Sequence, residues 1–126
     1  MAPTEHGRTT RIRVRAEGVV LLGRLDDNPA ARALVEQLPV TLTFRHFNAA
    51  ELISPLHRPL PMAGMPAGAD PSPQDIGYYA PSRDLVFYYG DVGFWNGIAI
   101  LGSFESDLAA LAHHDGDVTA TVELMQ

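Results

Sequence analysis

The sequence contains no cysteine and no lysine. Without cysteine the chain cannot form disulfides, thiolate metal sites or cysteine nucleophiles, and this composition fits the cytoplasm. All nine basic residues are arginine, which together with the abundant alanine, glycine and proline suggests a GC-rich bacterial genome. The absence of cysteine limits the chemistry, and the absence of lysine concerns only the source organism.

Long apolar runs and an excess of positive charge are also missing. No apolar run approaches the roughly 18 residues of a membrane span, and the N-terminal stretch MAPTEHGRTTRIRVRAEG lacks a hydrophobic segment that could serve as a signal peptide. We therefore expect a cytoplasmic protein. The net charge of −6 offers no electrostatic basis for binding nucleic acid or an anionic membrane.

Sequence motifs for phosphate binding, for a serine nucleophile and for a metal site are absent as well. There is no phosphate-binding glycine loop, no serine-nucleophile motif and no HExxH. Two groups of potential metal ligands remain. Asp26 and Asp27 stand where a helix begins, and acidic residues favour that end of a helix. His113 and His114 are neighbours, and neighbours on a helix diverge by about 100°, so they do not easily bind one ion. We predict neither a metal nor a cofactor.

What is present is the composition of one folded domain. The chain has 126 residues, 46% of them apolar, and its mean hydropathy is −0.01. A chain of this length buries about two-thirds of the surface that its unfolded form exposes. We predict a single domain over residues 1–126, with a flexible N-terminus at residues 1–9.

The first part of the chain predicts a hairpin, a helix and a third strand. Apolar and polar residues alternate over 10–16, which is typical of a half-buried strand, and Glu17-Gly18 turns the chain into a second strand at 19–25. Asn28 suits the N-cap of a short helix, and Pro29 suits its first position. Pro39 ends this helix, and alternation over 40–44 predicts the third strand.

Periodicity is then lost over residues 48–75, where six prolines lie between Pro55 and Pro73. A structureless run of this length in a compact domain is either a functional lid or a tolerated insertion. We favour a lid that Leu52, Ile53 and Leu56 anchor.

The rest of the chain is organised around residues 75–104, which hold most of the aromatic side chains. Strands at 76–80 and 85–89 form a hairpin around the turn Pro-Ser-Arg-Asp. A loop carrying Phe94 and Trp95 follows, and then a strand at 98–104 in which Gly102 marks a bulge or a close backbone approach. Ser106 is expected to cap a second helix.

A last strand at 117–124 completes an inventory of seven or eight strands and two short helices. Closure of a sheet into a barrel removes its exposed edges. The sequence therefore predicts a mainly β fold, a closed antiparallel barrel with two short capping helices.

Two segments also resemble a known family. The C-terminal stretch GDVGFWNGIAILGSFESDLAALAHHDGDVTATVEL is similar to the C-terminal half of cyclophilins, with a tryptophan loop, a glycine-containing strand, a short helix and a last strand. QDIGYYAPSRDLVFYYGD resembles the small bacterial and archaeal cyclophilin-like proteins, which are mostly without assigned function. The resemblance covers residues 11–123 except for the proline-rich stretch, and it implies the cyclophilin-like barrel.

The same resemblance implies site residues. Cyclophilins are peptidyl-prolyl isomerases that use an arginine beside a histidine after a strand phenylalanine, and Phe44-Arg45-His46 is similar to that run with the basic pair reversed. Phe87 matches the phenylalanine of the proline pocket, and Trp95 matches the loop tryptophan. The pocket histidine that follows the tryptophan in the family has no counterpart here.

We therefore carry several hypotheses forward. The first is a binding module for an apolar small molecule or an extended, proline-containing peptide. Its pocket would be lined by Phe47, Tyr79, Phe87, Tyr89 and Trp95. The alternatives are a weak prolyl isomerase, with Arg45 as donor to the prolyl nitrogen, and an isomerase or cyclase of an apolar metabolite assisted by His46. A structural domain that forms a homodimer is a further possibility.

Overall fold

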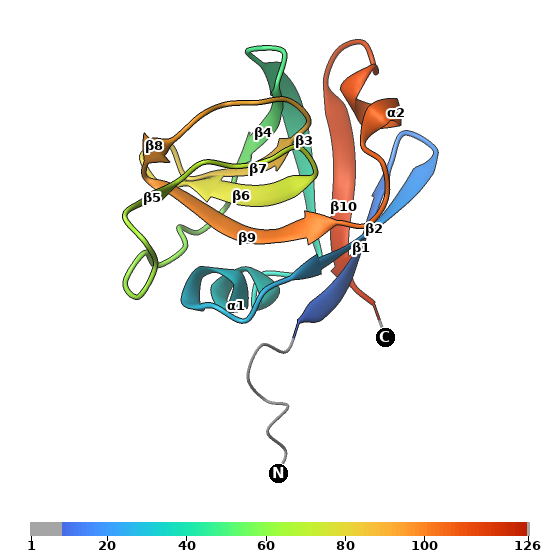
Figure 1. Ribbon diagram of the computed structural model, residues 1–126. Coiled ribbons are helices and arrows are strands. Elements are labelled where there is room, and N and C mark those ends of the chain that lie inside the picture. Colours follow the sequence, from blue (N-terminus) through green and yellow to red (C-terminus); the bar gives the residue numbers. More distant parts are fainter. Residues whose placement is uncertain (1–8, 126) are drawn as a thin grey trace.

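The computed structural model describes residues 9–125, so the predicted flexible N-terminus lies outside this range except for Thr9. Within it, eight antiparallel strands close into a barrel in the order β1-β10-β3-β4-β7-β6-β9-β2 (Figure 1). The bounds of these strands are β1 Thr10–Ala16, β2 Val19–Leu25, β3 Val40–Phe47, β4 Glu51–Pro55, β6 Asp75–Tyr79, β7 Asp84–Tyr88, β9 Ile98–Phe104 and β10 Val118–Leu124. The prediction of a mainly β, closed antiparallel barrel is confirmed.

Three smaller features complete the fold. Two short strands, β5 (Gly68–Ala69) and β8 (Trp95–Asn96), pair with each other outside the barrel. The helices α1 (Pro29–Val35) and α2 (Ala109–Ala112) lie at opposite ends of the barrel (Figure 1). Asn28 caps α1 by accepting a hydrogen bond from the Ala31 amide at 2.9 Å, and Pro29 is the first helical residue, as predicted.

The inner face of the barrel is the core, and strand alternation decides which side chains reach it. On β7, Leu85 and Phe87 point inward, whereas Val86 and Tyr88 point outward. The Phe87 ring stacks on Phe44 with centroids 4.5 Å apart and meets Phe104 edge-on at 4.9 Å. A second, smaller apolar cluster therefore lies on the outer wall.

Gly102 marks a close approach between two strands, as its position within an apolar strand predicts. A Cβ atom at Gly102 would lie 2.0 Å from the carbonyl oxygen of Arg24 on β2. The register of β6 against β9 also shifts between Ile76 and Gly77. The glycine thus allows β9 to lie close to β2 beside this irregularity, at a position where Gly102 is paired with Ile76 of β6 and with Leu25 of β2.

The predicted lid over residues 48–75 needs a correction. Its first part, Glu51–Pro55, is barrel strand β4, paired with β3 and β7. Leu52 faces the main core and Ile53 the outer cluster, and both are buried, so the alternation that reveals a strand is missing from the sequence. After the strand, Leu56 and Leu60 are also buried, and the Leu60 amide donates to the Tyr78 hydroxyl at 3.1 Å.

The second helix also differs from its prediction. Ser106 does not cap it, because its hydroxyl accepts a hydrogen bond from the Leu22 amide at 2.9 Å and thereby ties the chain to β2. The helix starts at Ala109, one turn long, and the Asp107 carboxylate accepts from the Ala109 amide at 2.8 Å.

Candidate functional site

Two hollows on the described part of the barrel bring predicted site residues or other polar groups together. The first, here called the outer hollow, measures about 340 Å³ and lies on the outer wall. It is lined by Phe47, Asn48, Ala50, Glu51, Tyr79, Tyr88, Asp91, Val92, Trp95 and Ile98. The second, the mouth cavity, measures about 480 Å³ and lies beneath α2. It is lined by Ala49, Gln74, Tyr89, Asp107, Leu108, Ala109, Ala112 and His113.

Three neighbouring strands build the floor of the outer hollow. The register places Phe47 of β3 opposite Glu51 of β4, and Glu51 opposite Tyr88 of β7. Because directly opposite residues share a face of the sheet, the three side chains form one row across the outer wall. The Tyr88 ring lies over Gly77, where an added Cβ would be 2.6 Å from it.

The loop between β7 and β9 builds the wall of the outer hollow. It carries Trp95, whose indole nitrogen donates to the carbonyl oxygen of Val92 at 3.3 Å and whose surface is 54% exposed. Gly68 of β5 lies so close beneath this loop that a Cβ would be 2.5 Å from the Trp95 carbonyl oxygen. The pairing of β5 with β8 thus holds the tryptophan at the edge of the hollow.

The electrostatics of the outer hollow are acidic. Burial raises the pKa of the Glu51 carboxyl above its ordinary value, and the charge of Asp84 adds to the shift. Burial likewise raises the pKa of the Tyr88 phenol, followed by the charges of Glu51 and Asp75. Tyr88 is therefore a neutral phenol at physiological pH, while the half-buried Glu51 carboxylate is poorly solvated.

Arg45 lies on the same outer face but at the rim. Its side chain is exposed, and its guanidinium stands over the Phe47 ring, 5.7 Å from the centroid. It does not line the outer hollow. The parity of β3 separates it from His46, the next residue, which points toward the barrel end.

His46 belongs to the mouth cavity through Tyr89. Its Nε2 lies 2.8 Å from the carbonyl oxygen of His114, and its Nδ1 lies 2.9 Å from the Tyr89 hydroxyl. A carbonyl only accepts, so Nε2 carries a proton, and in the neutral imidazole the Tyr89 hydroxyl donates to Nδ1. The cavity thus holds a phenol whose proton is directed away from it, toward His46.

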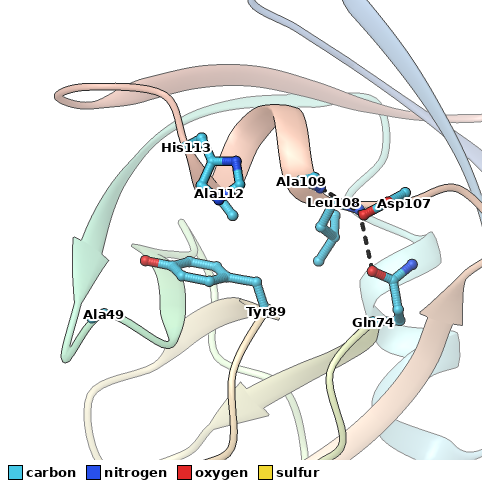
Figure 2. Close-up of a pocket in the computed structure, with 8 residues that line it drawn as sticks. All are labelled: Ala49, Gln74, Tyr89, Asp107, Leu108, Ala109, Ala112 and His113. Carbon is cyan, nitrogen blue, oxygen red and sulfur yellow. Dashed lines mark hydrogen bonds between the residues drawn. The ribbon is translucent and has the colours of Figure 1, made fainter.

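The remaining polar groups of the mouth cavity are mostly engaged. Figure 2 shows the Tyr89 ring facing Ala112 and His113, with Gln74 on another side of the cavity. The Gln74 side chain accepts from the Leu108 amide at 3.2 Å and donates to the Ser106 carbonyl. Burial raises the pKa of the Tyr89 phenol, and the charge of Glu51 adds to it. The hydrogen bonds of Gln74 hold the segment that leads into α2 over the barrel end.

The predicted site residues are thus divided among three places. Phe47, Tyr79 and Trp95 meet at the outer hollow, with Arg45 at its rim, whereas His46 and Tyr89 meet at the barrel mouth. The prediction that Phe87 lines the pocket is corrected by the structure. Phe87 is 1% exposed, packs between two other rings and lines neither hollow. Its inward parity on β7 is the physical reason.

Several lining residues were not predicted. Glu51 and Tyr88 belong to the floor of the outer hollow, and Asp91 to its edge. The sequence gives no sign of Glu51 because β4 lacks the alternation typical of a strand, whereas the outward direction of Tyr88 follows from its position on β7. Gln74, Asp107 and His113 of the mouth cavity lie in loops far apart in sequence and carry no signal that joins them.

The described part of the chain has neither a metal-binding cluster nor a helix that could span a membrane. Residues 9–125 contain no group of three or more histidine, aspartate or glutamate side chains arranged to hold a metal ion. His113 lines the mouth cavity, whereas Nε2 of His114 lies 3.7 Å from a carboxylate oxygen of Glu17. Neither helix in this range has the length and apolar character that crossing a bilayer requires.

Comparisons with known proteins agree with this architecture. A sequence profile described as the cyclophilin-like family matches residues 14–123. The solution structure of a hypothetical protein from Archaeoglobus fulgidus superposes with a TM-score of 0.70 at 16% identity, over 99% of this chain and 100% of the other. No curated protein sequence matches the chain. At this identity the superposition shows a shared fold.

Proposed function

This chain belongs to the cyclophilin-like family, and because its barrel has a hollow lined by aromatic rings on the outer wall, we propose that it is a binding module for an extended peptide. The peptide occupies the outer hollow, with one side chain seated between Phe47, Tyr79 and Trp95. The absence of cysteine fits a reducing compartment, so the expected partner is a cytoplasmic peptide.

The observation that carries this proposal is the exposure of aromatic rings in one region. Among residues 9–125, four large apolar side chains are exposed, and three of them are Phe47 at 42%, Phe94 at 62% and Trp95 at 54%. Phe47 and Trp95 line the outer hollow. Clustered aromatic exposure around a concavity is typical of a binding surface rather than of an unoccupied wall.

The position of Phe94 favours a peptide over a compact small molecule. Phe94 is next to Trp95 in the chain and is the most exposed of the three rings, yet it does not line the hollow. A ligand that fills only the 340 Å³ of the outer hollow leaves this ring in water. A chain that continues past the hollow covers it.

Binding is also favoured over prolyl isomerisation. That reaction needs a donor aimed at the prolyl nitrogen within an apolar pocket. Arg45, the predicted donor, stands at the rim over Phe47, and Phe87, the predicted pocket ring, is in the core. Arg45, Phe87 and Trp95, which the isomerase hypothesis places in one site, therefore do not share one surface.

The test is a titration with the peptides acetyl-Ala-Ala-Xaa-Pro-Ala-amide, where Xaa is Phe, Leu, Arg or Glu. Trp95 is the only tryptophan, so its emission reports on the hollow, and amide NMR shifts locate the contact. At least one peptide should shift both, and Phe47→Ala should weaken its binding, whereas Val20→Ala, at an exposed apolar residue of β2, should not.

Four results would overturn the proposal. The first is the absence of any shift at millimolar peptide concentration. The second is a set of shifts confined to the mouth cavity. The third is emission from Trp95 that depends on protein concentration alone, which would indicate a homodimer. A chymotrypsin-coupled isomerisation assay in which wild-type activity disappears with Arg45→Ala would replace the binding proposal by the isomerase.

A further inference from the structure

We propose that the side chain seated in the outer hollow is cationic, an arginine or lysine of the bound peptide. This inference rests on the proposed function and adds the chemical class of the residue that is recognised. It follows from three features of the hollow: its carboxylates, its aromatic faces and the burial of Glu51.

The carboxylates come from two different elements that line the hollow. Glu51 lies in the floor on β4, and Asp91 lies at the edge in the loop after β7. The residues that line the hollow include no arginine, lysine or histidine, and within residues 9–125 neither carboxylate is in an ion pair or a side-chain hydrogen bond. The hollow therefore carries negative charge that the described part of the chain does not neutralise.

The aromatic faces suit the same ligand. Four rings line the hollow, from Phe47, Tyr79, Tyr88 and Trp95. An ammonium or guanidinium group over such a ring is attracted by its quadrupole, and the effect is largest for tryptophan. The chain itself makes this contact at the rim, where the Arg45 guanidinium stands over Phe47. The apolar stem of a long basic side chain also packs well on rings while its charge reaches a carboxylate.

The burial of Glu51 makes a neutral ligand a poor fit. Its carboxylate is partly removed from water by the walls of the hollow. A neutral side chain that fills the hollow would remove the remaining water and leave the charge unpaired, which is costly. A cationic side chain supplies the missing partner as it displaces the water. Asp91 is exposed and contributes mainly attraction at longer range.

The test compares matched peptides that differ in one charge. The probes are acetyl-Ala-Ala-Xaa-Ala-Ala-amide, with Xaa as arginine or its neutral analogue citrulline, and as lysine or norleucine. Affinities are measured by Trp95 emission in about 20 mM and about 200 mM salt. The wild type should bind the arginine peptide about tenfold more tightly than the citrulline peptide, and added salt should weaken only the charged peptides.

The variants connect this preference to the hollow. In Glu51→Gln the ratio between the arginine and citrulline peptides should fall to about one to three, because the buried partner of the cation is gone. Asp91→Asn should lower it by less. Asp115→Asn is the control, because it changes the net charge by the same amount. Asp115 is exposed and lies outside both hollows, so this variant should leave the ratio unchanged.

The outcomes separate this inference from the proposal on which it rests. Equal affinity for the arginine and citrulline peptides, with binding still lost in Phe47→Ala, would overturn the cationic preference and leave peptide binding standing. A preference that survives Glu51→Gln combined with Asp91→Asn would also overturn it. Failure of every peptide, with benzylamine shifting Trp95 emission, would overturn both statements in favour of a small amine.

Discussion

Replacing Phe87 with alanine is expected to remove a large share of the stability of the barrel and to leave no direct mark on the outer hollow. Phe87 is 1% exposed and contacts two rings, at centroid distances of 4.5 Å to Phe44 and 4.9 Å to Phe104. Truncation of a buried phenylalanine to alanine costs about 3–5 kcal/mol. Both aromatic pairs are lost with it, so the upper part of this range is expected.

The size of the effect can be set against the whole domain. At about 2.1 cal/mol/K for each residue, the 126 residues unfold with an entropy of roughly 0.26 kcal/mol/K near the midpoint. A loss of about 3–5 kcal/mol therefore lowers the melting temperature by roughly 11–19 °C. Far-UV circular dichroism melts and urea titrations measure this directly.

The matched control is Phe47→Ala, the same substitution at a ring that is 42% exposed. Its loss should stay below about 1 kcal/mol, or about 4 °C, because much of this ring already lies in water and its contact with Arg45 is at the surface. If Phe87→Ala does not fold, Phe87→Leu gives a milder version of the same comparison. A Phe87→Ala protein that melts within about 4 °C of the wild type but no longer binds peptide would refute the assignment of this ring to the core.

Three further predictions concern individual side chains. Glu51→Gln should raise the melting temperature at neutral pH, because burial raises the pKa of the carboxyl in the folded state and its ionisation then opposes folding; the difference from wild type should vanish as pH falls through that raised pKa, in melts from about pH 8 to 4. His46→Ala removes two ring hydrogen bonds and should lose about 1–3 kcal/mol in urea titrations, whereas Tyr89→Phe, which removes one of them, should lose about half as much. Gly102→Ala should disrupt the barrel, since the added methyl would lie 2.0 Å from the Arg24 carbonyl oxygen, and a native-like amide NMR spectrum would contradict this.

The parts of the fold that the sequence predicts well are those with a local physical cause. The hairpin of β1 and β2 follows from alternation and from a turn pair in which Glu17 and Gly18 both have positive φ, at 49° and 81°. The start of α1 follows from Asn28 and Pro29. In each case neighbours along the chain determine the conformation, so no tertiary information is needed.

The parts that were missed depend on contacts between distant segments. β4 has no alternation because both of its faces are covered, one by the core and the other by Val86 and Tyr88. Ser106 has the residue type of an N-cap, but the nearby amide of Leu22 takes its hydroxyl. A tertiary hydrogen bond thus overrides a local preference, and the sequence carries no sign of which partner wins.

The site was predicted in composition but not in arrangement, and the reason is again alternation. The sequence predicts one pocket lined by Phe47, Tyr79, Phe87, Tyr89 and Trp95. In strand β7 and its continuation, Phe87 and Tyr89 are two residues apart and so share the inner face, whereas Phe47 of β3 faces outward. Parity alone separates the inner pair from the outer ring. The place of Trp95 depends on β5, an earlier segment of the chain in which Gly68 pairs with Asn96 and Ala69 pairs with Trp95.

At position 51, folding and the proposed peptide binding make opposite demands on the residue. Packing would favour a neutral side chain at position 51, because the carboxylate there is partly buried among rings without a cation beside it. The adjacent pair on the same wall, Ile53 and Val86, meets that demand with two apolar residues. A gain of stability in Glu51→Gln together with a loss of selectivity for the arginine peptide would therefore identify position 51 as one where a less stable residue serves ligand recognition. A gain of stability without any loss of selectivity would mean that the carboxylate plays no part in binding.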